Sequence, residues 1–148
     1  MTTMKKAIIS IKGAQQHPES EADDIVELVT DGLFSFKDGL ARFTYMESEL
    51  TGLDGTKTTF DISPLSVTMT REGTMNSQMI FEEGKKHNFL YDTPFGATTM
   101  GVNTSRVSVD MNERGGAMEV DYMVDYQQSV VGHNHFMINV RLRKDEGQ

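Results

Sequence analysis

Apolar and polar residues alternate with a period of two over much of this chain, most regularly near its C-terminal end. Two stretches carry the pattern: Met118, Val120, Tyr122, Val124 and Tyr126, then Phe136, Ile138, Val140 and Leu142. Successive side chains of a β-strand point to opposite faces, so this period predicts strands with one buried and one wet face. Glycine and proline divide the rest of the chain into similar short segments. We therefore expect an all-β chain of about eight to ten strands joined by turns.

Turn signals and phase changes place the strand ends. Asp38-Gly39 lies between two alternating segments and supplies the positive φ angles of a type I′ hairpin turn. The alternation changes phase after Val102, which predicts a β-bulge or bend near residues 103–105. For the last hairpin we expect the turn at residues 128–132, so that four charged residues meet on the wet face: Glu119, Asp121, Arg141 and Arg143.

Residues 19–30 fit two kinds of element. An acidic first turn followed by apolar residues at helical spacing favours a helix. The alternation of Val26, Leu28 and Thr30 favours a strand instead. We expect a strand from about Asp24 onward, because the neighbouring segments are all extended.

Composition excludes several classes of protein. The chain has 148 residues, no cysteine and a formal net charge of −8. Disulfides, thiol catalysis and thiolate zinc sites are therefore excluded, and the acidic balance disfavours nucleic acids and anionic membranes as partners. We find no stretch with the pattern of a secretory signal or a membrane span. We expect a cytoplasmic protein with a single domain over residues 1–148, frayed at residues 1–4 and 145–148.

Strand edges determine the expected architecture. A series of hairpin-linked strands must protect its two outer edges, and closing an up-and-down meander into a barrel removes them. We therefore expect a single antiparallel up-and-down β-barrel of the lipocalin or calycin type. A barrel of this size can hold one small ligand, although side chains can also fill its interior. The fold suggests a ligand site without establishing one.

Several short motifs resemble a known family. The chain is similar to the YwiB-like bacterial domains of unknown function in Tyr45-Met46-Glu47, Arg71-Glu72-Gly73, Met79-Ile80-Phe81, Tyr91-Asp92-Thr93-Pro94-Phe95-Gly96 and Tyr122 with Phe136-Met137-Ile138-Asn139-Val140. The resemblance covers roughly residues 6–143. It implies an antiparallel barrel, similar to lipocalins and fatty-acid-binding proteins, in a small cytoplasmic protein. The family brings no established activity, so the resemblance concerns the fold.

Two charged residues fall on predicted inward faces. Glu47 continues the phase of Tyr45, and Arg71 continues that of Leu65 and Met69. An inward charge must be paired or solvated, and a guanidinium can hold a carboxylate or phosphate through its bidentate fork. The alternative is that both side chains reach solvent at the rim or pair with each other. The ligand-binding residues that we predict, for a small apolar or carboxylate ligand, are Arg71, Glu47, Tyr45, Met79, Phe81, Tyr91 and Tyr122.

Other chemical signatures are weak. His133 and His135 point to the same side of a predicted strand, but no third metal ligand can be identified. Residues 19–27 are acidic yet lack the ligand spacing of a calcium loop. Hydrolase, phosphate-loop, dinucleotide and metalloprotease motifs are missing from the sequence, so we predict no catalytic residue, metal or cofactor.

Two functions from different classes follow. The first is a non-enzymatic barrel that binds a small ligand among Met, Phe and Tyr side chains. The second is a filled barrel that acts as a structural or protein-interaction module, as a homodimer for example. Both need a buried apolar interior, for which we predict Tyr45, Phe81, Tyr91, Tyr122, Val124, Phe136, Ile138 and Val140.

Overall fold

The structure of the protein is a computed structural model. It describes residues 4–16, 24–48, 54–74, 76–93, 96–127 and 129–143, without the side chains of residues 15, 16, 24, 91–93 and 131. Every regular element in these residues is a β-strand, which confirms the expected all-β class. This described part of the chain contains no helix long and apolar enough to cross a membrane.

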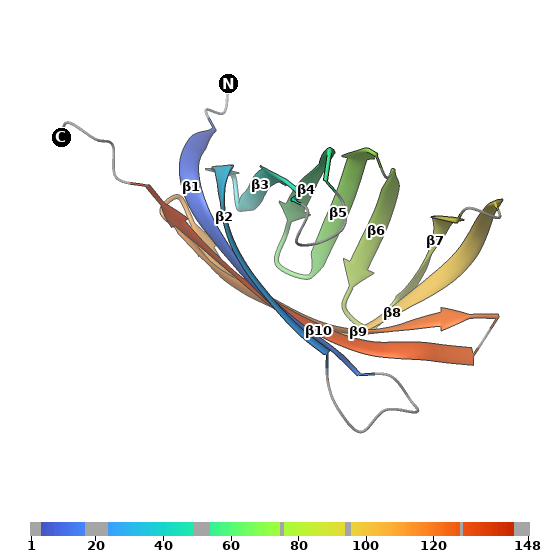
Figure 1. Ribbon diagram of the computed structural model, residues 1–148. Helices are drawn as coiled ribbons and strands as arrows, with labels where there is room; N and C mark the ends of the chain where they lie inside the picture. Colours follow the sequence, from blue (N-terminus) through green and yellow to red (C-terminus); the bar gives the residue numbers. More distant parts are fainter. Residues whose placement is uncertain are drawn as a thin grey trace.

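Ten strands form one antiparallel sheet in the order β6-β5-β4-β3-β2-β1-β10-β9-β8-β7. Because β1 pairs with β10, the first and last strands join the two halves of the meander. Figure 1 shows the long strands β1, β2, β8, β9 and β10 as a curved surface, with β3 to β6 standing across from it. The result is a nearly closed barrel. Its strands are β1 (Lys5–Gln16), β2 (Asp24–Lys37), β3 (Leu40–Met46), β4 (Thr56–Ile62), β5 (Ser66–Gly73), β6 (Ser77–Glu82), β7 (Lys86–Thr93), β8 (Gly96–Asn112), β9 (Gly115–Tyr126) and β10 (Ser129–Leu142).

The barrel is incompletely closed between β6 and β7, the two outer strands of the sheet. These strands diverge from the turn that joins them (Figure 1). Backbone hydrogen bonds from Gly84 to Thr104, 2.9 Å, and from Thr104 to Lys85, 3.2 Å, attach this turn to β8. Across the turn, His87 Nε2 lies 2.9 Å from Glu82 Oε1, and this contact holds the pKa of the Glu82 carboxyl below its usual value. The connection between the two outer strands is therefore anchored at its base.

The expected bulge in β8 is confirmed. The register of β8 against β9 shifts between Thr104 and Arg106. Just after the shift, the Val107 backbone N–H donates to Glu83 Oε1 at 3.0 Å. A bulge leaves a residue without its partner in the strand ladder. Here a carboxylate from the β6–β7 turn accepts a hydrogen bond from the backbone of β8 beside the bulge.

The segment that fitted both helix and strand is a strand from Asp24 onward. β2 pairs with β1 from Asp24 to Phe34, but with β3 only from Leu33 onward. Gly32 lies at this division, where a Cβ atom would overlap the Ile9 side chain and the Thr44 carbonyl oxygen. Glycine therefore permits the close approach of three strands at the point where β3 leaves β2. Residues 17–23 lie outside the described residues.

The two hairpin predictions had different outcomes. Asp38 and Gly39 have φ angles of 55° and 79°, as a type I′ turn requires. The last turn is earlier than expected, because β9 ends at Tyr126 and β10 begins at Ser129, with a bulge between Val130 and Gly132. The expected contact of Glu119 and Asp121 with arginines is wrong: the register sets His135 across from Asp121, Met137 across from Glu119 and Arg141 across from Gly115.

Inward residues of all parts of the barrel form one core. Its fully buried large side chains include Ile9, Phe34, Phe43, Phe81, Val120 and Ile138. Tyr45 and Val140 are buried as predicted, whereas Tyr122, Val124 and Phe136 are only half-buried. Leu65 does not begin the inward face of β5, since it precedes the strand in a turn and is 61% exposed. The side chain of Tyr91 lies outside the described residues.

Candidate functional site

Buried polar residues gather in one half of the barrel. Antiparallel strands alternate in direction, so each end of the barrel collects alternate turns. The packed end has the β2–β3 and β4–β5 turns and is lined by Phe34, Ala41, Ile62 and Val67, each at most 3% exposed. The polar end is the opposite half and contains Tyr45, Glu47, Thr58, Arg71 and Tyr122. Glu47, Thr56 and Thr58, three of the four buried polar side chains that the structure describes, lie in this half, whereas Thr104 lies beside the β6–β7 turn.

Glu47 and Arg71 meet at the polar end. The register places Thr58 of β4 across from both Tyr45 and Arg71, and Glu47 follows directly after β3. Thr58 Oγ1 donates to Glu47 Oε2 at 2.5 Å, and Arg71 Nε lies 3.7 Å from the same oxygen. The Glu47 side chain is 1% exposed and that of Arg71 is 25% exposed. Arg71 therefore lies beside a buried carboxylate while a quarter of its own side-chain surface remains accessible.

The two tyrosines of the polar end remain protonated well above neutral pH. Burial raises the pKa of Tyr45 far above its usual value, and the negative charge of Glu47 raises it further against the opposing effect of Arg71. Burial raises the pKa of Tyr122 to about 12, although the positive charge of Arg71 lowers it. Neutral phenols can donate hydrogen bonds. The polar end thus combines a cation with two hydroxyl donors.

An aromatic cluster continues from the polar end into the core. The ring centroids of Phe81 and Tyr122 are 4.7 Å apart, and those of Phe81 and Phe136 are 5.5 Å apart in an edge-to-face arrangement. Phe60 reaches Phe136 at 6.0 Å from the opposite wall. Aromatic pairs at these separations contribute about 0.5–1.5 kcal/mol beyond their buried area. The polar end therefore lies next to an apolar cluster of aromatic side chains.

Most of the predicted ligand residues occupy connected positions. Arg71, Glu47 and Tyr45 meet directly, Arg71 acts electrostatically on Tyr122, and Tyr122 packs on Phe81. Met79 is half-buried and pairs with Met69 on the same inward row. For Tyr91, only the backbone is described: it pairs with Thr98 of β8.

Sequence reasoning missed the threonines of this site. Thr58 and Thr56 share the inward phase of Phe60 and Ile62, so the signal was present. Threonine also suits an exposed strand face, and its type alone does not separate the two locations. A further buried threonine, Thr104 beside the β6–β7 turn, was missed because the bulge in β8 changes the phase beside it. Its hydroxyl is buried without a hydrogen-bond partner among the described residues.

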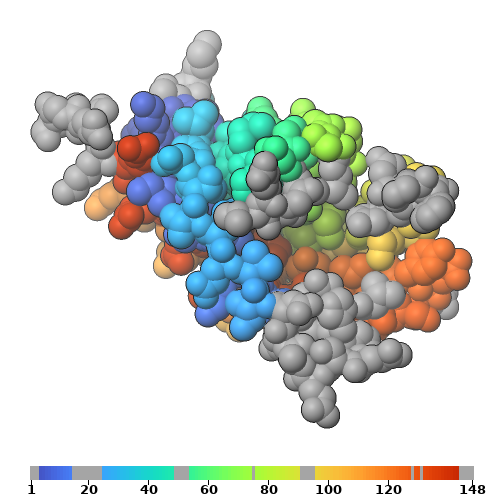
Figure 2. Space-filling view, in the orientation of Figure 1, coloured from blue at the N-terminus to red at the C-terminus, as the bar shows by residue number. Residues whose placement is uncertain are grey.

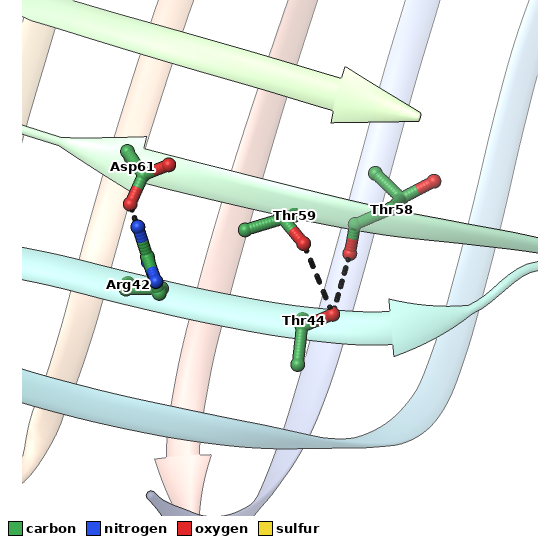
Figure 3. A network of polar contacts seen from close by, with 5 residues as sticks. All are labelled: Arg42, Thr44, Thr58, Thr59 and Asp61. Carbon is green, nitrogen blue, oxygen red and sulfur yellow. Dashed lines mark hydrogen bonds and ion pairs between the residues drawn. The ribbon is translucent and has the colours of Figure 1, made fainter. Parts of the chain in front are cut away.

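The outer face of the same strands has a different polar network (Figure 3). Arg42 Nε donates to Asp61 Oδ1 at 2.6 Å, and both side chains are exposed by more than 40%. Thr44 Oγ1 donates to the Thr58 carbonyl oxygen at 3.1 Å. A groove of about 630 Å³ lies over this side of the barrel, and it includes Arg42 and Asp61 but none of the predicted ligand residues. Since Arg42 already has a carboxylate partner at hydrogen-bond distance, it offers a matched control for Arg71.

His135 of β10 has two carboxylate neighbours on the outer face. His135 Nε2 lies 3.0 Å from Glu119 Oε1, and Nδ1 contacts Asp121 Oδ1. The two carboxylates thus approach opposite ring nitrogens, whereas metal ligands would have to converge on one point. Over the described residues, no group of three or more His, Asp or Glu side chains is arranged to hold a metal ion.

The fold and the interior define the structural class of this protein. It is an antiparallel, nearly closed barrel with a polar site at one end. Residues 9–138 match the family described as "Domain of unknown function (DUF1934)", and the chain belongs to this family. The crystal structure of ywiB protein from Bacillus subtilis is similar, with a TM-score of 0.82 and 17% sequence identity over 97% of this chain and 96% of that chain. At this identity the likeness concerns the fold. A search of curated proteins found no match.

Proposed function

We propose that the polar end binds a small amphipathic molecule, with an anionic group at Arg71 and an apolar part against the aromatic cluster. The observation that carries the proposal is the state of Arg71. Its Nε is buried without a hydrogen-bond partner among the described residues, and its nearest carboxylate oxygen, on Glu47, is 3.7 Å away. A guanidinium has five donors and matches a carboxylate in a bidentate fork. An anionic ligand would supply the close partner that Glu47 does not.

The phenols support the same ligand chemistry. A phenol of ordinary pKa, about 10, is already protonated at neutral pH, and burial raises the pKa values of Tyr45 and Tyr122 further. A neutral hydroxyl can donate to an anion, whereas a phenolate would repel it. Tyr45 already interacts with Glu47, which leaves Tyr122 as the better second donor.

The apolar part of the ligand is proposed from the half-buried residues beside Arg71. Tyr122 and Phe136 pack on Phe81, yet both remain partly exposed, and so does Met79. Methionine adapts its shape to a ligand at little cost. Fatty acids and related apolar carboxylates fit this combination of one cation with an adaptable apolar wall.

A titration with a fluorescent fatty acid tests the proposal. We expect Arg71→Met to weaken binding by tenfold or more, which is about 1.4 kcal/mol. Arg42→Met is the matched control: it removes an arginine that is paired with Asp61 on the outer face, so affinity should not change. A probe with an alcohol in place of the carboxylate should bind wild-type protein as weakly as the acid binds Arg71→Met.

Two results would contradict this function. Equal affinity of wild-type protein and Arg71→Met for the acid would remove Arg71 from the site. If neither probe binds the wild type, the second function, a filled barrel without a ligand, is favoured.

A further inference from the structure

The first half of β2 is an open edge of the sheet. Residues 24–32 of β2 pair with β1 on one side, whereas β3 pairs with β2 only from Leu33 onward. In the part of the chain that the structure describes, no strand pairs with residues 24–32 on the other side. Figure 2 shows this part of β2, in lighter blue, at the surface. Free N–H and C=O groups along such an edge can pair with another chain.

The side chains along this edge are unusually apolar for an exposed strand. Ile25 is 59% exposed, Val26 is 55% exposed and Val29 is 69% exposed. Natural proteins commonly protect an edge with lysine, proline or a bulge. The described β2–β1 register runs from Asp24 to Phe34 without a bulge, and this stretch of β2 contains neither lysine nor proline.

The outward face of β2 alternates apolar and acidic residues: Ile25, Glu27, Val29, Asp31 and Leu33. Glu27 lies 3.7 Å from Lys12 of β1, and Asp31 lies 3.3 Å from Arg143. Both carboxylates nevertheless remain at least 70% exposed. Exposed ion pairs of this kind contribute only about 0–1 kcal/mol. The acidic character of the edge is therefore available to a further partner.

We propose that this edge binds an extended segment of another protein by strand addition, and that the segment alternates apolar and basic residues. Main-chain hydrogen bonds to β2 would give affinity, and side-chain pairs across the new ladder would give specificity. Basic side chains lie opposite Glu27 and Asp31, and apolar ones lie opposite Ile25 and Val29. The net charge of −8 also favours the approach of a basic partner.

Charge argues against a second copy of this chain as the partner. Two β2 edges related by a two-fold axis would pair antiparallel, with outward faces kept together. In some of these registers Glu27 lies opposite Glu27 or Asp31 of the second copy. In the others an acidic residue lies opposite Val29 or another apolar residue. Like charges directly opposite each other destabilise a pair of strands. The edge is complementary to a basic strand and not to itself.

Binding of a synthetic peptide tests the proposed strand addition at β2 independently of any ligand in the barrel interior. The probe is Val-Thr-Lys-Thr-Val-Thr-Lys-Thr-Val with a fluorescent label, and the control peptide has glutamate in place of both lysines. We expect the basic peptide to raise its fluorescence anisotropy on binding, more strongly at low salt, and to protect backbone amides of residues 25–31 from hydrogen exchange. The acidic peptide should not bind.

Two protein variants complete the test. Val29→Lys introduces a positive charge into the edge and should weaken binding of the basic peptide by tenfold or more. Leu65→Lys changes an apolar residue of similar exposure, 61%, in the β4–β5 turn, and should leave binding unchanged. The proposal is overturned if the wild-type protein binds neither peptide or binds both equally, or if Val29→Lys has no effect. A wild-type dimer that Val29→Lys dissociates in sedimentation would also overturn it, because a second copy would then occupy the edge.

Discussion

The packed end and the polar end are built from the same strands by the same alternation, yet their interiors differ in chemistry. At the packed end, Phe34, Ala41, Ile62 and Val67 exclude water with apolar side chains alone. Four residues beyond Ala41 and Val67, the same inward rows change to Tyr45 in β3 and Arg71 in β5, and Glu47 follows directly after β3. Burying a charge is costly without partners, so a chain that needed only stability would continue the apolar row. The two ends therefore differ in how their interiors are stabilised, and the polar end is the one where we propose a ligand.

The largest expected difference between the two ends concerns phenylalanine. Phe34 is 1% exposed at the packed end, whereas Phe136 is half-buried at the other. We expect Phe34→Ala to lower the free energy of unfolding by about 3–5 kcal/mol. Phe136→Ala should cost less, because part of its side chain is already hydrated. Urea unfolding of both variants measures this, and an equal or larger loss for Phe136 would show that the polar end is packed as tightly as the other.

Two buried threonines, Thr58 at the polar end and Thr104 beside the β6–β7 turn, sharpen the comparison. Thr58→Val removes the hydroxyl that donates to buried Glu47 and should cost about 1–3 kcal/mol. Thr104→Val removes a buried hydroxyl without a hydrogen-bond partner in the described structure, so the free energy of unfolding should stay the same or rise. Thermal or urea unfolding separates the two. A large loss for Thr104→Val would mean that its hydroxyl has a partner outside the described residues.

The pair of Glu47 and Arg71 has a smaller expected coupling. At 3.7 Å, with Nε not hydrogen-bonded to a described residue, we expect a double-mutant cycle of Arg71→Met and Glu47→Gln to give a coupling below about 1 kcal/mol. The Arg42 and Asp61 pair on the outer face, measured in the same way, is the reference. If Arg71→Met prevented folding and added Glu47→Gln restored it, the pair would be structural and Arg71 would not be available to a ligand.

The smallest expected effect on the free energy of unfolding comes from the two buried tyrosines, and only at alkaline pH. The folded-state pKa of Tyr122 is raised to about 12 and that of Tyr45 is raised as well, both above the unfolded value. Their contribution to stability is therefore complete below about pH 10 and is lost as the pH rises through the folded-state pKa values. Tyr122→Phe should flatten the alkaline decline in unfolding free energy relative to the wild type. An unchanged alkaline decline would contradict the burial of this phenol.

Alternation made much of the fold predictable, because side-chain direction in a strand depends only on residue parity. The strand from Asp24, the Asp38-Gly39 hairpin and the bulge in β8 could all be placed from local sequence. The register of the last hairpin could not, since Gln127 adopts a left-handed conformation with φ of 51° that its residue type does not favour. A shorter turn then shifted Asp121 from the arginines to His135.

The candidate site was predictable to a similar extent. Parity alone placed Arg71, Glu47 and Tyr45 inside, and the barrel brought Tyr122 to them from a distant strand. The opening between β6 and β7 and the free edge of β2 were not predictable. Both depend on where neighbouring strands separate, as β2 and β3 do at Gly32. The alternation of side chains predicts which face a residue lies on, but not which strand pairs with it.

Native mass spectrometry of the protein, purified without denaturation from its own host, tests most directly whether the polar end holds a ligand. We predict that wild-type protein carries the added mass of an amphipathic carboxylate, and that Arg71→Met loses most of it while Arg42→Met retains it. A bare mass for the wild type, or the same added mass on Arg71→Met, would contradict a ligand site at Arg71.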